Sequence, residues 1–182
     1  MDMETLKEAI VTLHEEYRIP HIVVTSITLP ALGELPSLSV VGSTFTITAE
    51  PRIFEIKIPA IDCFFSGTGD MFAALMLVRL REAVHTIEGL VKTKSWVSGD
   101  EVKATELPLA KACEKVLASM HEVLTRTKVS RDAELEKYKG VDWEGDEKKK
   151  RVVESKAAEV RLIRNLDCLR HPDVKFRAER FP

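Results

Sequence analysis

The sequence predicts an α/β fold in which a mainly parallel sheet is flanked by helices and carries a hairpin-like edge. The first observation is a helical spacing of apolar residues over Met3–Tyr17 that leads directly into the short apolar segment His21–Ile27. The second is a pair of strand-like segments, 38–47 and 52–59, around a turn. With 182 residues and 45% hydrophobic content, the chain is long enough for a single domain with a buried core.

The strand candidates differ in pattern. The segment His21–Ile27 is apolar and rich in β-branched residues, which is typical of a strand buried on both faces of a parallel sheet. In 52–59, Ile53, Glu55 and Lys57 alternate with apolar residues, so one face of this strand is expected to meet water. The segment 29–37 contains Pro and Gly and is expected to be a loop.

Two further helices are predicted. The first begins at Asp70 and runs to about residue 84, and it is apolar on nearly every side as far as Arg79, which indicates burial against the sheet. The second spans 108–127 and carries one broad apolar stripe.

The last third of the chain is more polar. Residues 128–151 are highly charged and predict a solvated surface linker. Alternation returns in 159–163 and 174–179, which predicts two edge strands.

Composition excludes several classes of function. The formal net charge is −2, so the chain lacks the global positive field of a nucleic-acid binder. The three cysteines form no CxxC pair and predict reduced thiols in a cytoplasmic protein. No apolar stretch approaches the length of a membrane span, and the acidic start is unlike a signal peptide, so no membrane partner is expected. No metal-ligating cluster is predicted either.

One short stretch carries the chemistry. Gly67, Thr68, Gly69 and Asp70 form a turn into the predicted apolar helix. Glycines let backbone amides converge and leave space for a ligand, and the free amides at a helix start attract anions. The same field favours the ionised form of a carboxylate in the first turn. The stretch therefore predicts an anion hole from Gly67 to Gly69, with Asp70 as a base. The residues alone equally allow the alternative that Thr68 or Asp70 only caps the helix.

The segment "FFSGTGDMFAALM" resembles the phosphate-binding and catalytic signature of the ribokinase-like superfamily, and its extension is similar to the pyridoxal kinase family. Three other stretches carry the same resemblance: "IVVTS" at 22–26, "LSVVGS" at 38–43 and "ACEKVLASMHEVLTRT" at 112–127. The tail "EVRLIRNLDCLRHPD" also looks like the end of a eukaryotic-type member.

The resemblance implies ATP-dependent phosphorylation of the 5′-hydroxymethyl group of pyridoxal, pyridoxine or pyridoxamine. It implies that Asp70 takes the hydroxyl proton and that Gly67, Thr68 and Gly69 hold the transferring phosphate. The remaining nucleotide contacts that it implies are Thr25, Ser26, Ile61 and Asp62. It also implies the cofactors Mg²⁺ and a monovalent cation of the potassium type, and a possible homodimer.

The resemblance is partial and leaves alternatives open. The strands and ring-holding residues of the vitamin-binding half, and the acidic and asparagine positions near Mg²⁺, have no counterpart here, so residues 1–182 are expected to be the C-terminal portion of a longer kinase domain. One alternative is a non-catalytic fragment that binds nucleotide or pairs with an intact kinase. Another is a different small-alcohol kinase, such as a hydroxymethylpyrimidine kinase.

Overall fold

The computed structural model describes residues 3–27, 37–45, 48, 50–141, 143 and 145–182. Its elements, in chain order, are α1 (Met3–Tyr17), β1 (His21–Ile27), β2 (Ser37–Phe45), β3 (Pro51–Pro59), α2 (Thr68–His85), α3 (Pro108–Glu136), α4 (Glu147–Ala157), α5 (Leu166–Arg170) and β4 (Glu179–Arg180), with short 3₁₀ turns between α2 and α3 and before α5. The first helix and first strand have the predicted bounds. The expected loop at 29–37 lies, except for its last residue, outside the described residues.

The sheet is antiparallel, so the prediction of a mainly parallel sheet was wrong. Its strand order is β1-β2-β3-β4, and each neighbouring pair is antiparallel. The hairpin is confirmed: β2 and β3 pair over their full lengths, from Ser37 opposite Pro59 to Phe45 opposite Pro51.

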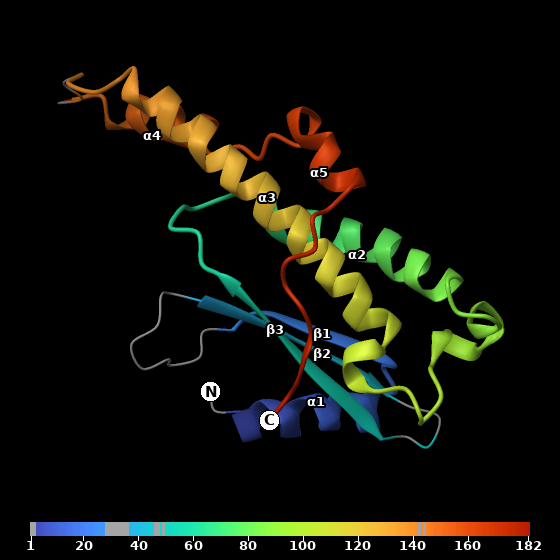
Figure 1. The fold of residues 1–182 in the computed structure, drawn as a ribbon. Helices are drawn as coiled ribbons and strands as arrows, with labels where there is room; N and C mark the ends of the chain where they lie inside the picture. The colour runs from blue at the N-terminus through green and yellow to red at the C-terminus, as the bar shows by residue number, and fades with distance from the viewer. Residues whose placement is uncertain (1–2, 28–36, 46–47, 49, 142, 144) are drawn as a thin grey trace.

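Both faces of this sheet are covered, which explains the misleading apolar pattern of its strands. In Figure 1, α1 lies on one face and the long α3 crosses the other, with α2 beside it. One core cluster joins the sheet to α3 and contains Val40, Phe54, Ile56, Leu107, Leu109, Ala110, Cys113 and Leu117. The other joins the sheet to α1 and contains Leu6, Ile10, Val41, Ile53 and Phe181. Because strands with two covered faces lose the alternation of polar and apolar residues, their sequences resemble those of parallel strands.

The predicted wet face of β3 is also covered. Glu55 is buried, and its carboxylate accepts a 2.5 Å hydrogen bond from the hydroxyl of Ser39 on β2. On the same face, Lys57 and Pro59, at the end of the strand, are exposed. A buried carboxylate needs such a partner, because burial without a hydrogen bond is costly.

The helix α2 packs on α3, and it is not buried on all sides as predicted. Its outer face exposes Leu77 (72%) and Val78 (54%). Arg79, predicted to mark its wet end, is buried instead. Its guanidinium donates to the carbonyls of Leu169 and Arg170, at the end of α5, and to the carboxylate of Glu82. This arginine therefore ties α5 to α2.

The charged segment 128–151 lies at the surface but is largely helical. The first part continues α3 to Glu136, where an ion pair of 2.8 Å joins Lys128 to Asp132 one turn later. The last part begins α4, whose start is capped by the Asp146 carboxylate, which accepts a hydrogen bond from the Lys149 amide.

Of the two edge strands predicted in the tail, the first is wrong and the second is wrong in extent. Residues 159–163 form a bend, a turn and the start of a 3₁₀ helix, and only Glu179–Arg180 pairs with β3. The tail before this pair is instead held by the buried Glu114 of α3, which accepts hydrogen bonds from the Ala178 amide (3.0 Å) and from Arg177 (2.9 Å). A backbone amide bonded to a side chain cannot also join a strand ladder, which is why the pairing is so short.

Candidate functional site

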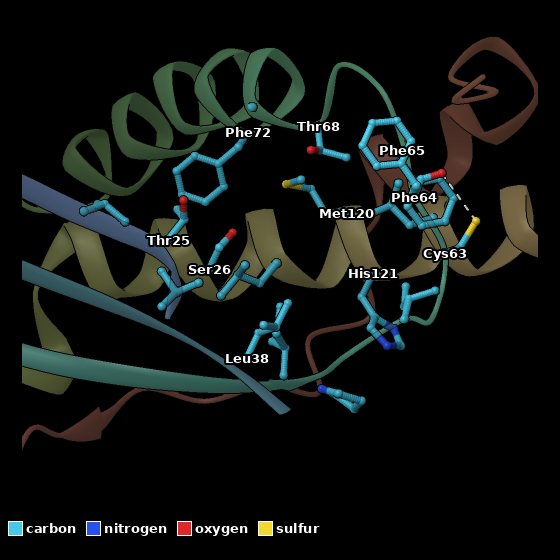
Figure 2. Close-up of a pocket in the computed structure, with 18 residues that line it drawn as sticks. Thr25, Ser26, Leu38, Cys63, Phe64, Phe65, Thr68, Phe72, Met120 and His121 are labelled. Carbon is cyan, nitrogen blue, oxygen red and sulfur yellow. Dashed lines mark hydrogen bonds between the residues drawn. The ribbon is translucent and has the colours of Figure 1, made fainter. Parts of the chain in front are cut away.

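A cavity of about 540 Å³ opens between the sheet and the two helices α2 and α3. Figure 2 shows β1 and the start of α2 converging on this cavity, with α3 forming the wall behind it. The strands contribute residues near the end of β1, the start of β2 and the end of β3. The full lining is Val23, Thr25, Ser26, Leu38, Val40, Ile58, Pro59, Ile61, Cys63, Phe64, Phe65, Thr68, Gly69, Phe72, Leu117, Met120, His121 and Leu124.

A β-bulge places Thr25 and Ser26 at this cavity. The pairing of β1 with β2 is regular as far as Val24 and resumes at Ile27 with a shifted register. Ser26 has φ = 60°, a left-handed conformation that is uncommon for a residue other than glycine. Bulges re-aim side chains and are frequent beside active sites, and strained backbone often marks function. The irregularity therefore presents two adjacent hydroxyl side chains at the cavity.

The start of α2 forms the opposite side of the cavity. Gly67 is the N-cap residue with φ = 79°, which favours glycine, and no side chain caps the helix. The first intrahelical bond runs from the Met71 amide to the Gly67 carbonyl, so the amides of Thr68, Gly69 and Asp70 precede it and lack a helical acceptor. The alternative in which Thr68 or Asp70 caps the helix is therefore not what the structure shows.

Gly69 has no structural reason to be glycine. Its φ lies outside the left-handed region, and a Cβ atom added there would meet no heavy atom within 4 Å. It nevertheless lines the cavity. A side chain at this position would project into open space, which is where an anion bound to the helix start would approach.

Asp70 lies in the same first turn but does not line the cavity. Its side chain is exposed and forms no hydrogen bond or ion pair with any residue that the structure describes. Asp62, in the loop that leads from β3 to α2, is also exposed and does not line the cavity. An exposed carboxylate without a partner is free to meet a ligand from solvent.

The structure therefore brings together most of the residues that the sequence singles out. Thr25, Ser26, Ile61, Thr68 and Gly69 all line one cavity. The other three, Gly67, Asp70 and Asp62, adjoin lining residues in the chain.

Sequence reasoning missed the α3 wall of the cavity. This helix contributes Leu117, Met120, His121 and Leu124. The available signal was the width of its apolar stripe, which is broader than one contact with a sheet requires. Phe72 of α2 was missed for the same reason, because it stands in a run that is apolar on every side.

The cavity is apolar and almost free of charge. None of its lining residues is Asp, Glu, Lys or Arg. Burial lowers the pKa of His121 below its usual 6.5, so this ring is neutral at pH 7. The ring stands edge-on to Phe176 at a centroid distance of 5.1 Å. Such a lining suits a flat, uncharged ring, and the hydroxyls and free amides at the other side suit an anion.

No ready-made metal cage accompanies this cavity. In the part of the chain that the structure describes, no three His, Cys, Asp or Glu side chains lie close enough to hold a metal ion. A magnesium ion often needs only one or two protein carboxylates, because substrate phosphates supply its other ligands. Over the same described residues, no helix is both long and apolar enough to cross a membrane.

Comparisons with known proteins give a consistent result. No protein-family model matches the chain. Two Schizosaccharomyces pombe proteins named pyridoxal kinases are similar to it in sequence. One is 30% identical over 125 residues, covering 69% of this chain and 35% of the relative. The other is 33% identical over 135 residues, covering 73% of this chain and 36% of the relative.

Solved structures of pyridoxal kinases share the fold. The enzyme from Leishmania donovani in complex with ADP superposes on 100% of this chain and 46% of its own, with a TM-score of 0.62 and 17% identity. PdxK from Plasmodium falciparum with AMP-PNP and PL superposes on 96% of this chain and 42% of its own, with a TM-score of 0.56 and 18% identity. The chain thus spans 35–36% of the length of its curated relatives and less than half of these structures.

Proposed function

Because the chain is a homologue of the pyridoxal kinases over part of their length, we propose that it serves the ATP-dependent phosphorylation of the 5′-hydroxymethyl group of pyridoxal, pyridoxine or pyridoxamine. The observation that carries this proposal is the convergence of the β1 bulge and the start of α2 on one apolar cavity. In this arrangement the chain supplies the nucleotide side of the reaction. Structural relatives with ADP or AMP-PNP support this assignment.

Each predicted residue has a role that its position allows. The amides at Gly67, Thr68 and Gly69 hold the phosphate that is transferred, and the hydroxyls of Thr25 and Ser26 contact the other phosphates. Ile61 and Asp62 flank the nucleotide from the loop before α2.

Asp70 is the proposed base. Its carboxylate has no partner among the described residues, and it stands in the same helical turn as the amides. It accepts the proton of the hydroxyl that attacks the phosphate.

The described residues fit a nucleotide but include no complete metal site. Mg²⁺ is therefore proposed to arrive with the nucleotide phosphates, where it neutralises charge on the transferring group. A potassium-type cation is proposed from the family resemblance. We also propose that residues 1–182 are the C-terminal portion of a kinase domain, and that most of the vitamer pocket belongs to the other portion.

The test is formation of pyridoxal 5′-phosphate from pyridoxal, Mg-ATP and K⁺ by the purified protein. Asp70→Asn is expected to reduce kcat by about 10²- to 10⁴-fold, the usual effect of removing a general base, and to leave ATP affinity almost unchanged. Glu88→Gln is the matched control, because Glu88 is an exposed acid just beyond the far end of α2. Equal and measurable rates in wild type and Asp70→Asn would refute the role of Asp70.

A second candidate function is a non-catalytic partner that binds nucleotide or pairs with an intact kinase. The observation that favours it is the outer edge of β1. This strand stands at one end of the sheet order and contains no Lys, Arg, Asp, Glu or Pro, the residues that usually protect an edge from pairing. Within the described chain, no backbone hydrogen bond joins this edge to another segment.

Binding data separate the two functions. ATP binding without turnover, together with co-elution with an intact pyridoxal kinase, would favour the pairing partner. Turnover by the chain alone would exclude it. Failure to bind ATP would refute the kinase proposal and the nucleotide-binding form of the second candidate, and failure to co-elute with an intact kinase would refute its pairing form. A substrate screen with hydroxymethylpyrimidine tests the remaining alternative, another small-alcohol kinase.

A homodimer and a cytoplasmic location remain proposals, and neither nucleic acid nor a membrane is proposed as a partner.

A further inference from the structure

A second cavity lies at the other end of β3 from the first one. It also has a volume of about 540 Å³. The first cavity is lined by Ile58 and Pro59 at the end of this strand, and the second by Pro51, Arg52 and Ile53 at its start. With a rise of about 3.3 Å per strand residue, Ile53 and Ile58 are roughly 17 Å apart. The two cavities share no lining residue.

The second cavity gathers positive charge from four separate segments. Its lining includes Lys7 of α1, Arg52 of β3, Lys103 of the loop before α3 and Arg180 of β4. The carboxylates around it belong to Glu50 and to the chain end at Pro182. Cations therefore outnumber carboxylates here, although the whole chain has a formal net charge of −2.

Among the residues that the structure describes, these four cations have no acidic partner. Many exposed lysines and arginines elsewhere are paired, for example Lys128 with Asp132 and Arg126 with Asp167. No ion pair among the described residues includes any of the four cations of the second cavity. Like charges that face one hollow repel one another and raise its affinity for an anion.

The side chain of Arg52 is held in position by a hydrogen bond. Its side chain is half-buried, and one N–H group donates to the carbonyl of Val102, which anchors it to the loop that carries Lys103. A guanidinium has five N–H donors in a rigid fork, so donors remain for a ligand. Phe181, which packs in the core beneath α1, fixes the position of the adjacent Arg180.

We propose that this cavity is a binding site for a small phosphate-bearing anion, separate from the site at the start of α2. A phosphate group matches both the fork of an arginine and the point charges of lysines, and it carries enough charge to engage several cations at once. The cavity volume falls in the usual range for small-molecule sites. The proposal needs neither nucleotide at the first cavity nor phosphoryl transfer.

Inorganic pyrophosphate is the probe, titrated into the full chain by calorimetry at low ionic strength. Lys103→Glu and Arg180→Glu are each expected to weaken its binding about tenfold or more, because each loses a charge-assisted contact and gains repulsion. Lys92→Glu is the matched control: Lys92 is exposed, has no acidic partner among the described residues, and lines neither cavity. It should bind pyrophosphate like the wild type.

The outcomes decide the proposal independently of the first site. Pyrophosphate that binds only at the start of α2 would give the same isotherm in wild type and Lys103→Glu, which would overturn the proposal. Equal losses in Lys103→Glu and Lys92→Glu would show a general charge effect and would also overturn it. Wild type that does not bind pyrophosphate would overturn it as well. The unfolding midpoints of all variants show that each is folded during the titration.

Discussion

Replacing Gly69 by alanine separates a structural glycine from a functional one. Two positions in the first turn of α2 carry glycine, and the structure gives them different reasons. Gly67 has φ = +79°, which disfavours any side chain. Gly69 has an ordinary φ and an empty surrounding, so only a ligand would oppose a methyl group there.

Gly69→Ala is expected to affect stability and ATP affinity in opposite directions. In a helix, alanine is more favourable than glycine by up to about 1 kcal/mol, so Gly69→Ala should leave the free energy of unfolding unchanged or raise it. A methyl group in the proposed anion site would hold a phosphate away from the amides. Loss of one charge-assisted hydrogen bond costs about 1.5–3 kcal/mol, which corresponds to a loss of ATP affinity of roughly tenfold to a hundredfold.

Two measurements on the same variants test this reasoning. Urea unfolding gives stability, and calorimetric titration gives ATP affinity. The matched control is Gly67→Ala, which should lose about 1–2 kcal/mol of stability because alanine resists the left-handed conformation. The reasoning is refuted if Gly69→Ala unfolds more easily than the wild type, or if it binds ATP with undiminished affinity.

Three further predictions concern the fold. Gly42→Ala should lose about 1–3 kcal/mol in urea unfolding, because its Cβ would lie 2.2 Å from the ring of the fully buried Phe54. Glu114→Gln should loosen the tail by about 1–2 kcal/mol, seen as faster hydrogen exchange at Ala178, because its buried carboxylate accepts from that amide; unchanged exchange would contradict this. Burial lowers the pKa of His14 below 6.5, so the unfolded chain binds the extra proton first, and stability should fall as pH drops below about 6.5. His14→Gln should show a weaker pH dependence.

The sequence predicted local structure better than it predicted the sheet. Periodicity located α1 and β1 to the residue because apolar spacing and Pro20 act locally. Strand direction is not a local property. An antiparallel strand that is covered on both faces has the same apolar pattern as a parallel strand. The two are distinguished only by how the strand pairs with its neighbour, as in the antiparallel pairing of β2 with β3.

Two of the remaining errors share one cause, which is contact with residues distant in sequence. In the sequence, Arg79 has the pattern of the polar end of a helix. In the structure it is buried because it donates to carbonyl groups of α5, about ninety residues later in the chain. The alternation at 174–179 predicts a strand, but the Ala178 amide donates to the carboxylate of Glu114 and not to a neighbouring strand. No window of sequence around either residue contains its partner.

The candidate site was predictable only in its two short motifs. The glycines before an apolar helix are a local signal, whereas Thr25 and Ser26 were predicted only through the family resemblance; both stretches lie at the cavity. The wall formed by Met120 and His121 of α3 depends on how that helix crosses the sheet. Its apolar stripe indicates that this face of the helix is buried. The stripe cannot show that part of the face lines a cavity and does not pack against other side chains.

Because the two motifs belong to different layers, their spacing depends on the core between them. Val23 lies just before the β1 bulge, and Phe72 and Met76 lie just after the start of α2. All three side chains pack against the core cluster that joins the sheet to α3. A phosphate that bridges hydroxyls and amides tolerates little change in that spacing, since charge-assisted hydrogen bonds are short and directional. Phe72→Leu should therefore weaken ATP binding more than its loss of stability alone explains. A variant with the same stability loss from the α1 face, such as Ile10→Val, should keep its ATP affinity. If both variants bind ATP equally, the packing between the layers does not set the geometry of the site.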